Sequence, residues 1–433
     1  MLLQVKKKVF LTLFITILVL GSFQAITFVK ASFSGVTYVI DDETNITDYL
    51  WSSDGTKIAY LKFPDGRLNY DGELWIADKA GHSAKLSNNR QITLPNGHNF
   101  SSLEDWHGEW ILFHIADESG RPSSYYGRND LWKIRTDGTG LTQITRTGIT
   151  PNGIKTSSNP AYANRGTVTW ARFIPGTDGT MVYMSAHNGN GWYNPYICTT
   201  DGSFHWQELG NPSSTSDNSF TIGISPTGNK LVWGDASYWN NPTTLRTSNA
   251  DGSNVFTIKS FPHRTVPYVL ADGYTITYRY VPLPPVPATR EGNIYAINMD
   301  RSNDRTVLDD EFLNYPETYH PQNGQLMLMR SNRDPDGNWH FFSLNVTDPA
   351  ADEGIVQLTE GPYNDEMALY SPDAQYLMYR RLPDDFDFDA NSPPYPYQLV
   401  ITQVPVWLAP GFSFISIVLI LPVIALVRRR RKR

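Results

Sequence analysis

The sequence predicts an all-β protein, a seven-bladed β-propeller, and three observations support this prediction. A pattern of four short strands recurs with a period of about 50 residues, which is typical of sheets repeated around an axis. Aromatic residues, Gly and Pro are frequent, and no amphipathic helix is evident between residues 33 and 404. The N-terminal region also contains one strand that the last repeat lacks.

The clearest repeat element is residues 130–145, DLWKIRTDGTGLTQIT, which have the pattern of a β-hairpin. Apolar side chains, including Trp132 and Ile134, alternate along its first half. Asp137-Gly138 provides the positive φ that a tight turn requires, and the chain then returns antiparallel. A single hairpin cannot bury its own apolar face, so its recurrence indicates a larger assembly. Weaker copies of this hairpin occupy residues 73–93, 195–209, 245–258, 293–308 and 340–359.

Each repeat also has two strands joined by a short polar turn. The seven turns end at Gly55, Gly108, Gly179, Gly228, Gly273, Gly324 and Ala374. Successive turns are therefore separated by 53, 71, 49, 45, 51 and 50 residues. The long interval contains an insertion between residues 148 and 166, whose Asn, Ser, Pro and Gly content predicts a loop. Seven turns at this spacing predict seven blades.

The seventh repeat requires a strand from the other end of the chain. Residues 397–404 supply its third strand, and no fourth strand follows before a long apolar segment. Residues 36–40, VTYVI, have no partner in the first repeat. Pairing these two segments would close the ring and remove its exposed sheet edges. A six-bladed ring is the alternative.

The repeat resembles the TolB-like propeller repeat, a WD40-like type known as PD40. The shared features are an SPDG-like turn, an apolar strand, an Ile-Tyr or Leu-Trp strand, a DG turn and a final QLT. Residues 130–145 and 323–359 match best, and the resemblance covers roughly residues 36–404. It implies a propeller. It implies no particular activity, because this fold hosts enzymes, receptors and scaffolds.

The two ends of the chain predict export and membrane attachment. Three lysines precede an apolar run at residues 9–20, and small residues near position 31 predict a signal peptide over residues 1–31, with an uncleaved anchor as the alternative. Residues 405–427 predict a transmembrane anchor, in which the uncharged run 406–427 would extend about 33 Å as a helix. The basic tail, residues 428–433, predicts a cytoplasmic C-terminus. A β-propeller ectodomain over residues 32–404 would then lie outside.

Pro410, Gly411 and Phe412 precede the apolar span and the basic tail. This arrangement resembles the PGF-type sorting signal of archaeal surface proteins. The resemblance implies cleavage near the motif and attachment through a lipid. The chain lacks the Thr-rich spacer that usually precedes the motif, so an intact transmembrane anchor is the alternative.

Charge and cysteine content exclude several classes of function. Removing the four N-terminal lysines and the six basic tail residues leaves 26 of the 36 basic side chains against 43 acidic ones, a net charge of −17. Such a surface repels phosphate backbones, so we expect no nucleic-acid partner. Cys198 is the single cysteine, which excludes an internal disulfide and a cysteine-based zinc cluster.

The long connections between second and third strands are expected on the same face as the connections between blades. Aromatic side chains occur in them beside Asn, Asp and Arg, a combination that suits stacking on sugars or anchoring of a protein partner. The alternative is that these rings pack the loops against one another. The predicted ligand-binding residues are Tyr126, Trp192, Tyr193, Tyr238, Trp239 and Trp339.

Metal and cofactor chemistry has weaker support in the sequence. Asp385, Asp387 and Asp389 form a D-x-D-x-D run, but Ala390 and Pro396 stand where an EF-hand calcium loop has Gly and Glu. These aspartates are therefore weak metal candidates, and no cofactor is predicted. Some seven-bladed pectin-fragment lyases hold a metal with loop histidines, and such loop positions are occupied here by His98, His187 and His263.

These observations predict a membrane-anchored propeller that binds an extracellular glycan or a surface protein without catalysis. A metal-dependent uronate lyase and a structural envelope component are the alternatives. Asn45, Asn99 and Asn345 lie in N-x-S/T sequons and are predicted glycosylation sites.

Overall fold

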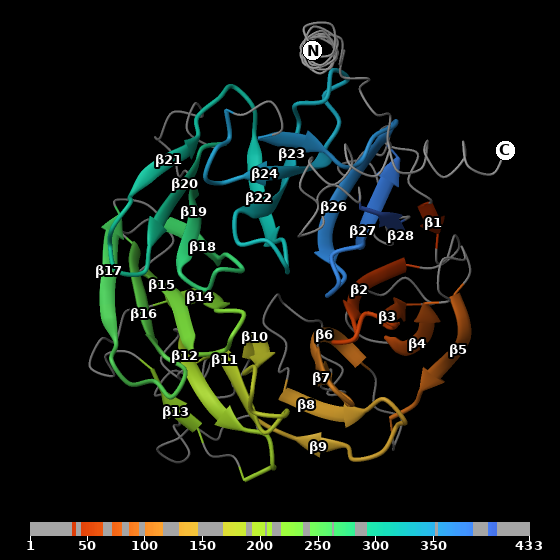
Figure 1. Cartoon of the computed structure of the whole chain (residues 1–433). Helices are drawn as coiled ribbons and strands as arrows, with labels where there is room; N and C mark the ends of the chain where they lie inside the picture. The colour runs from red at the N-terminus through yellow and green to blue at the C-terminus, as the bar shows by residue number, and fades with distance from the viewer. Residues whose placement is uncertain are drawn as a thin grey trace, which may run out of the picture. The chain divides into compact units, whose positions relative to one another are not determined.

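The computed structural model describes residues 37–39, 45–63, 72–79, 86–94, 100–115, 130–145, 168–187, 193–203, 206–209, 218–236, 243–261, 264–281, 292–350, 354–383 and 397–404. These residues form strands and turns without a helix. The strands make seven four-stranded antiparallel sheets around a central axis (Figure 1). The prediction of a seven-bladed β-propeller is confirmed.

No segment that the structure describes forms an apolar helix long enough to cross a lipid bilayer. The predicted signal peptide, transmembrane helix, basic tail and sorting motif, with Pro410, Gly411 and Phe412, lie outside the described residues.

Within each blade, consecutive strands are hydrogen-bonded neighbours. Blade 1 comprises β2 (Asn45–Trp51), β3 (Lys57–Phe63), β4 (Glu73–Lys79) and β5 (Leu86–Ile92). Blade 2 comprises β6 (Phe100–His107), β7 (Trp110–Ile115), β8 (Asp130–Arg135) and β9 (Thr142–Gln143). Blade 3 comprises β10 (Val168–Phe173), β11 (Met181–His187), β12 (Tyr193–Thr199) and β13 (Trp206–Glu208). Blade 4 comprises β14 (Asn218–Ile224), β15 (Lys230–Ala236), β16 (Thr243–Asn249) and β17 (Phe256–Phe261).

The last three blades follow the same plan, with one exception. Blade 5 comprises β18 (Arg264–Val269), β19 (Thr275–Val281), β20 (Ile294–Asn298) and β21 (Arg305–Leu308). Blade 6 comprises β22 (Asn314–Tyr319), β23 (Leu326–Ser331), β24 (His340–Asn345) and β25 (Ile355–Gln357). Blade 7 comprises β26 (Tyr363–Tyr370), β27 (Tyr376–Pro383), β28 (Gln398–Gln403) and, from the other end of the chain, β1 (Thr37–Val39).

Blade 7 closes the ring as the sequence predicts. Strand β1 pairs antiparallel with β28, and Tyr38 lies opposite Ile401. The pairing joins the two ends of the propeller by backbone hydrogen bonds and leaves no seam between first and last blades. The alternative of six blades is therefore wrong.

Aspartate side chains stabilise the tight turns between strands. Asp272 Oδ1 accepts a hydrogen bond from the N–H of Tyr274, two residues further on, at 2.8 Å. Oδ1 of five further aspartates accepts the same bond at 2.8–2.9 Å. Hydrogen bonds from Ser203 lower the pKa of Asp201 to about 2. Gly138 adopts φ of 86°, which explains the predicted Asp-Gly turn. The five aspartates are Asp54, Asp137, Asp201, Asp251 and Asp300.

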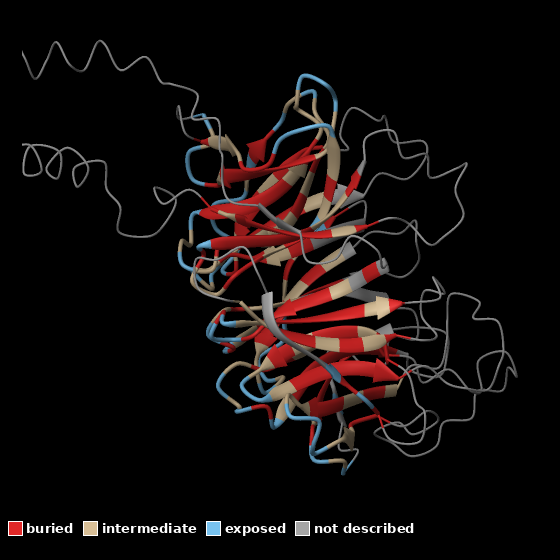
Figure 2. Cartoon of the chain, turned by 90° about the vertical axis from the view of Figure 1, so that its right-hand side faces the viewer, coloured by how far each residue is buried: buried red, intermediate tan, exposed pale blue. Residues whose placement is uncertain are grey.

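The propeller has two different faces. We call the face with the short turns the turn face, and the opposite face, which receives the second-to-third-strand and inter-blade connections, the loop face. Figure 2 shows exposed turns gathered on one side of the molecule. The N–H of Val404 donates to the carbonyl of Gln375 in a short turn, at 2.8 Å, and Thr37 lies opposite Thr402. Both described ends of the chain therefore lie at the turn face.

Apolar side chains fill the spaces between neighbouring blades. Between blades 1 and 2, Phe63, Phe100 and Phe113 are almost completely buried, and the last two rings have centroids 4.7 Å apart. Each such buried side chain contributes about 1.5–3 kcal/mol relative to exposure. Figure 2 shows the buried residues concentrated within the strands. This packing holds the first strand of each blade in place around the axis.

Candidate binding site at the mouth of the central channel

The first strand of every blade lies nearest the propeller axis (Figure 1), and we call the space around this axis the central channel. Six of these seven strands carry a register shift in their pairing with the second strand; β18 is regular. A bulge adds a residue and redirects the side chains beside it. Asp48, Glu104 and Glu317 lie within such shifts, and Glu366 lies at the edge of one.

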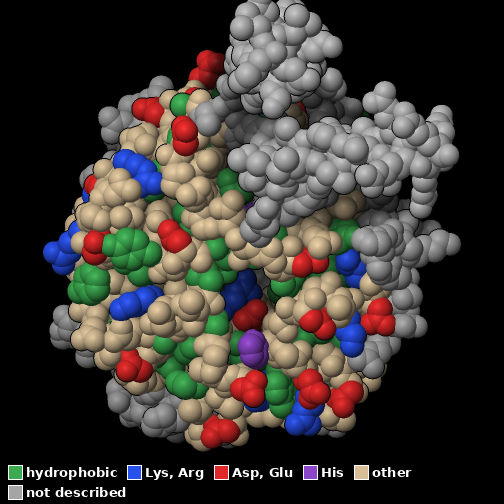
Figure 3. Space-filling model, viewed as in Figure 1, with side chains coloured by type: hydrophobic (Ala, Val, Ile, Leu, Met, Phe, Trp, Pro, Cys, Tyr) green, Lys and Arg blue, Asp and Glu red, His purple; other side chains and the backbone are tan. Residues whose placement is uncertain are grey.

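Electrostatic interactions across the ring show that charged groups face the channel. The pKa of Tyr319, on blade 6, is raised by burial, is lowered by Arg172 of blade 3 and is raised by Asp105 of blade 2. These blades lie on opposite sides of the axis (Figure 1). Figure 3, which views the turn face, shows acidic and basic side chains in the hollow at its centre. The channel is therefore polar and contains charges of both signs.

Blades 6 and 7 hold a connected group of ion pairs beside the channel. Arg380 Nη2 lies 2.6 Å from Glu366 Oε1, and Arg330 Nη1 lies 3.6 Å from Glu366 Oε2. Arg330 Nε is also 3.3 Å from Glu317 Oε1. Burial raises the pKa of Glu317 to about 7, while the guanidinium of Arg330 acts in the opposite direction. Glu317 is thus partly protonated near neutral pH.

Two arginines and two aromatic rings form a continuous stack, which we call the aromatic–arginine stack. The guanidinium carbons of Arg279 and Arg330 lie 4.5 and 5.5 Å from the ring centroid of Tyr315. The Trp339 ring is 5.2 Å from Tyr315, and Arg330 lies 5.3 Å from Trp339. Contacts of this kind between guanidinium groups and rings are attractive. All four residues are half-buried.

The position of this stack follows from the direction of the strands. Trp339 belongs to the connection between β23 and β24, which lies at the loop face. Tyr315 is the second residue of β22, which starts there, and Arg330 is the penultimate residue of β23, which ends there. Arg279 lies near the corresponding end of β19. The stack therefore lies at the loop-face mouth of the channel.

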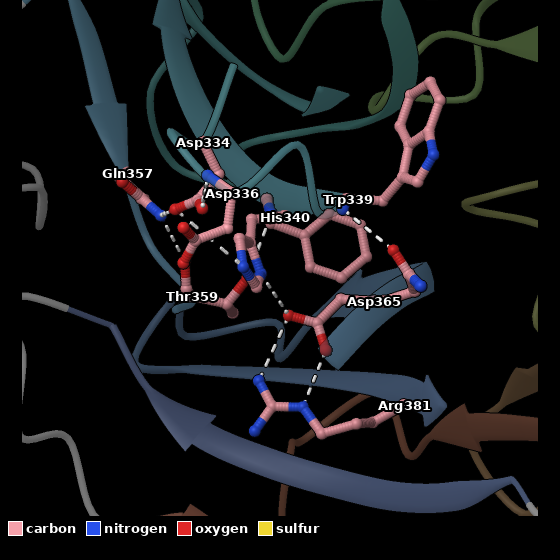
Figure 4. Close-up of polar contacts among 10 residues, drawn as sticks. Asp334, Asp336, Trp339, His340, Gln357, Thr359, Asp365 and Arg381 are labelled. Carbon is pink, nitrogen blue, oxygen red and sulfur yellow. Dashed lines mark hydrogen bonds and ion pairs between the residues drawn. The ribbon is translucent and has the colours of Figure 1, made fainter. Parts of the chain in front are cut away.

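A second polar group joins blades 6 and 7, and we call it the inter-blade latch. Asp365, fully buried, accepts hydrogen bonds from Arg381 Nε at 2.7 Å and Nη2 at 3.1 Å. His340 Nδ1 lies 3.1 Å from the same carboxylate (Figure 4). The N–H of Asp365 donates to the carbonyl of Trp339, and the N–H of Trp339 donates to Asn364 Oδ1. The latch thus fixes the backbone that carries the Trp339 ring.

The latch lacks the geometry of a nucleophilic relay. Thr359 Oγ1 lies 3.5 Å from His340 Nδ1, the nitrogen that also faces Asp365. In a relay the hydroxyl and the carboxylate must use different ring nitrogens. His340 Nε2 instead lies 4.0 Å from Asp334 Oδ2. The described residues contain no group of three His, Cys, Asp or Glu side chains that could hold a metal ion.

A different arrangement of buried polar groups occurs in blade 2. Ser102 Oγ lies 2.9 Å from His114 Nδ1, and Glu104 Oε1 lies 3.4 Å from the same nitrogen. Burial lowers the pKa of His114 to about 3 and raises that of Glu104 to about 8. Glu104 Oε2 also accepts a hydrogen bond from the N–H of Ala171 in blade 3, at 3.0 Å. Both side chains are neutral at pH 7, so this group joins two blades without a charge.

The predicted ligand-binding residues are only partly within the described structure. Trp339 was expected to be exposed, but it is half-buried because it packs on Tyr315 and Arg330. Tyr193 begins β12, and its side chain is not among those described. The remaining predicted ligand-binding residues, Tyr126, Trp192, Tyr238 and Trp239, lie outside the described residues.

The other predicted positions divide in the same way. Asn345 ends β24, and its Oδ1 accepts hydrogen bonds from the N–H and hydroxyl of Thr347. Asn45 begins β2 and His187 ends β11. Positions outside the described residues are Asp385, Asp387, Asp389, Asn99, His98 and His263.

Sequence reasoning missed the channel residues, although a signal for them was present. Acidic side chains recur in the first strands of the blades, for example Glu317 between Pro316 and Thr318. Strict two-residue alternation would assign each of these side chains to a face of the sheet, but a bulge interrupts that alternation. The bulges decide this, and they are visible only in the pairing of strands.

No known protein family matches the sequence, and no curated protein is significantly similar to it. Among solved structures, the chain is similar to the β-propeller domain of Cps50 (Swd1) from Myceliophteria thermophila, with 12% sequence identity and a TM-score of 0.51. The alignment covers 86% of this chain and 100% of that one. The shared property is the propeller fold.

Two further solved structures share the repeat architecture at lower similarity. An oligogalacturonate lyase in complex with manganese has 12% identity and a TM-score of 0.47, and covers 84% of this chain and 78% of its own. A putative TolB from Agrobacterium tumefaciens has 14% identity and a TM-score of 0.40, and covers 56% of this chain and 92% of its own. Likeness at these identities concerns the fold alone, and the site must be interpreted from its own residues.

Proposed function

We propose that this protein is a non-catalytic binding module that holds an extracellular glycan at the loop-face mouth of its central channel. The aromatic–arginine stack is the single observation that carries the proposal. Trp339 and Tyr315 offer half-buried ring surface, and guanidinium donors lie directly beside these rings. Apolar ring faces next to hydrogen-bond donors suit the faces and hydroxyl groups of sugars.

The orientation of the propeller supports a ligand on the loop face. Thr37 and Val404 lie at the turn face. An anchor over residues 405–427 would therefore hold the turn face towards the membrane and leave the loop face directed outward. This orientation is part of the proposal, together with the exported location and the membrane attachment on which it depends.

The chemistry of the described residues favours binding over catalysis. Glu317 forms an ion pair with Arg330, and Glu366 forms ion pairs with Arg330 and Arg380. His340 Nδ1 lies 3.1 Å from the carboxylate of Asp365, and this contact connects blade 6 to blade 7. A metal-dependent uronate lyase remains the alternative function, and a surface protein remains the alternative ligand.

The test is a glycan array probed with the full-length protein in detergent and with two variants. Trp339→Ala should reduce binding to the glycans that the native protein retains roughly tenfold or more, since central aromatic anchors contribute more than 1 kcal/mol. Tyr274→Ala is the matched control, because Tyr274 is an exposed aromatic residue in a turn-face turn. Absence of binding to every glycan, or equal binding by Trp339→Ala, would contradict the proposal.

A further inference from the structure

Arg279 differs from the other arginines on its side of the channel. Arg330 and Arg380 form ion pairs with Glu317 and Glu366. The Arg279 side chain makes no hydrogen bond or ion pair with another described residue, and its Nε is buried without a hydrogen-bond partner. Its guanidinium carbon lies 4.5 Å from the centroid of the Tyr315 ring, and Tyr268 also lies near enough to favour its charged form. A guanidinium group has five N–H donors, so most of the hydrogen-bonding capacity of Arg279 is unused.

The positive charge of Arg279 also lacks a counter-ion of its own among the described residues. Burial lowers the pKa of this guanidinium, and Arg330 acts in the same direction. Glu317 lies near enough to favour the charged form of Arg279. However, that carboxylate is already paired with Arg330. A half-buried cation that lacks its own counter-ion is costly, and an anionic ligand would remove that cost.

We infer that the bound glycan carries a carboxylate, which pairs with Arg279 while its sugar ring contacts Trp339. The inference rests on the proposed glycan-binding function and specifies the class of sugar, namely a uronic acid. Arg279 and Trp339 both lie within 5.2 Å of the Tyr315 ring centroid, so a single sugar and its carboxylate can reach both. The planar guanidinium donates two parallel hydrogen bonds to a carboxylate, which makes the contact selective.

The net negative charge of the protein restricts where an acidic glycan can bind. The exported region has a net charge of −17, so an acidic glycan is repelled by most of the surface. Binding of such a ligand therefore requires a local cation with unused donors. Among the described residues of the stack, Arg279 meets that requirement, because Arg330 is occupied by two glutamates.

The experiment measures affinity of the full-length protein for oligogalacturonate and for the same oligosaccharide after reduction of its carboxyl groups to hydroxymethyl groups. The native protein should bind the carboxylated form at least tenfold more tightly. Arg279→Gln should remove most of that difference, measured as the ratio of the variant's two affinities. Arg279→Lys should restore only part of it, because an ammonium group cannot form the paired hydrogen bonds.

A matched control distinguishes a direct contact between Arg279 and the ligand from the effect of removing any positive charge that lines the channel. Arg172 also contacts an aromatic ring, Trp170 at 5.5 Å, but it belongs to blade 3 on another side of the axis. Arg172→Gln should leave the preference for the carboxylated form within about twofold of the native value. An equal loss in Arg172→Gln and Arg279→Gln would overturn the inference.

The outcomes also distinguish failure of this inference from failure of the proposed function. Equal binding of carboxylated and reduced oligosaccharides, both abolished by Trp339→Ala, would refute the role of Arg279 and preserve glycan binding. Binding of neither oligosaccharide, with glycan-array binding intact, would refute the uronic acid class. Formation of an unsaturated product, detected by ultraviolet absorbance, would refute the non-catalytic function itself. Thermal unfolding should be similar in native protein and Arg279→Gln, since no described hydrogen bond is lost.

Discussion

The two sides of the central channel accommodate buried acidic groups in different ways. On the side of blades 6 and 7, Glu317, Glu366 and Asp365 each lie beside an arginine. On the side of blade 2, Glu104 accepts hydrogen bonds from neutral groups and contacts His114. Burial raises the pKa of both Glu317 and Glu104, to about 7 and about 8. The guanidinium groups of Arg330 and Arg172 oppose these rises, and Arg330 does so from within a direct ion pair with Glu317.

This difference has a consequence for where a ligand can bind. Blades 6 and 7 present charged and aromatic groups at the loop-face mouth, supported by the latch beneath Trp339. Blade 2 uses neutral groups to join blade 3 through Ala171. The proposed binding site therefore includes blade 6, whereas Glu104 of blade 2 contributes to the packing of blade 2 against blade 3.

The largest expected effect is a loss of stability when the carboxylate of Asp365 is removed from the charged side of the channel. Asp365→Ala leaves Arg381 and His340 buried without their carboxylate, so the free energy of unfolding should fall by about 3–5 kcal/mol. Urea unfolding of the full-length protein measures this change. Glu360→Gln, an exposed acid between β25 and β26, should have little effect. A cost below about 1 kcal/mol for Asp365→Ala would show that the latch is dispensable.

The next largest effect is a pH-dependent gain of stability when Glu104, on the neutral side of the channel, is replaced. The usual pKa of Glu104 is 4.5 and its folded value is about 8. Between these values the unfolded chain loses the proton and the folded protein keeps it, so this group lowers stability as pH rises. Glu104→Gln should therefore gain stability relative to native protein, on the order of 2–4 kcal/mol, between about pH 5 and about pH 9.

Urea unfolding of both proteins across this range measures the difference. The titration of His114, whose pKa of about 3 lowers stability in acid, is present in both proteins and cancels to first order. A stability difference that is independent of pH would show that Glu104 is ionised in the folded state.

The smallest expected effect concerns ligand affinity on the charged side. The pKa of Glu317 is raised to about 7, and Arg279, Arg330, Arg380 and Glu366 all face it. Protonation of Glu317 below that pH removes a negative charge near Arg279. Affinity for oligogalacturonate should then rise roughly threefold from about pH 8 to about pH 6, where the sugar carboxylates stay ionised.

Isothermal titration at the two pH values measures this change, and the carboxyl-reduced oligosaccharide is the control. Glu317→Gln should bind with a weaker dependence on pH. A native affinity that falls on acidification would indicate that the anion does not approach Arg279.

Much of the fold could be predicted from local pattern. The Asp-Gly turns, the spacing of the turn glycines and the unpaired segment near residue 38 predicted seven blades and their closure, and the structure confirms both. Turn chemistry is local, because Asp137 and Gly138 need only their neighbours in sequence. Trp339 was predicted as a ligand-binding residue from its loop, and the structure adds its contacts with Tyr315 and Arg330.

The sequence alone determined the repeat, the number of blades, the pairing of the two ends and the acidic balance of the chain between its basic terminal segments. Tertiary structure decided which side chains meet at the channel. The aromatic–arginine stack combines residues of blades 5 and 6. They are Arg279 of β19, Tyr315 of β22, Arg330 of β23 and Trp339 of the connection between β23 and β24. Their meeting depends on strand bulges and on the packing of whole sheets, and neither property is encoded in the residues immediately beside them.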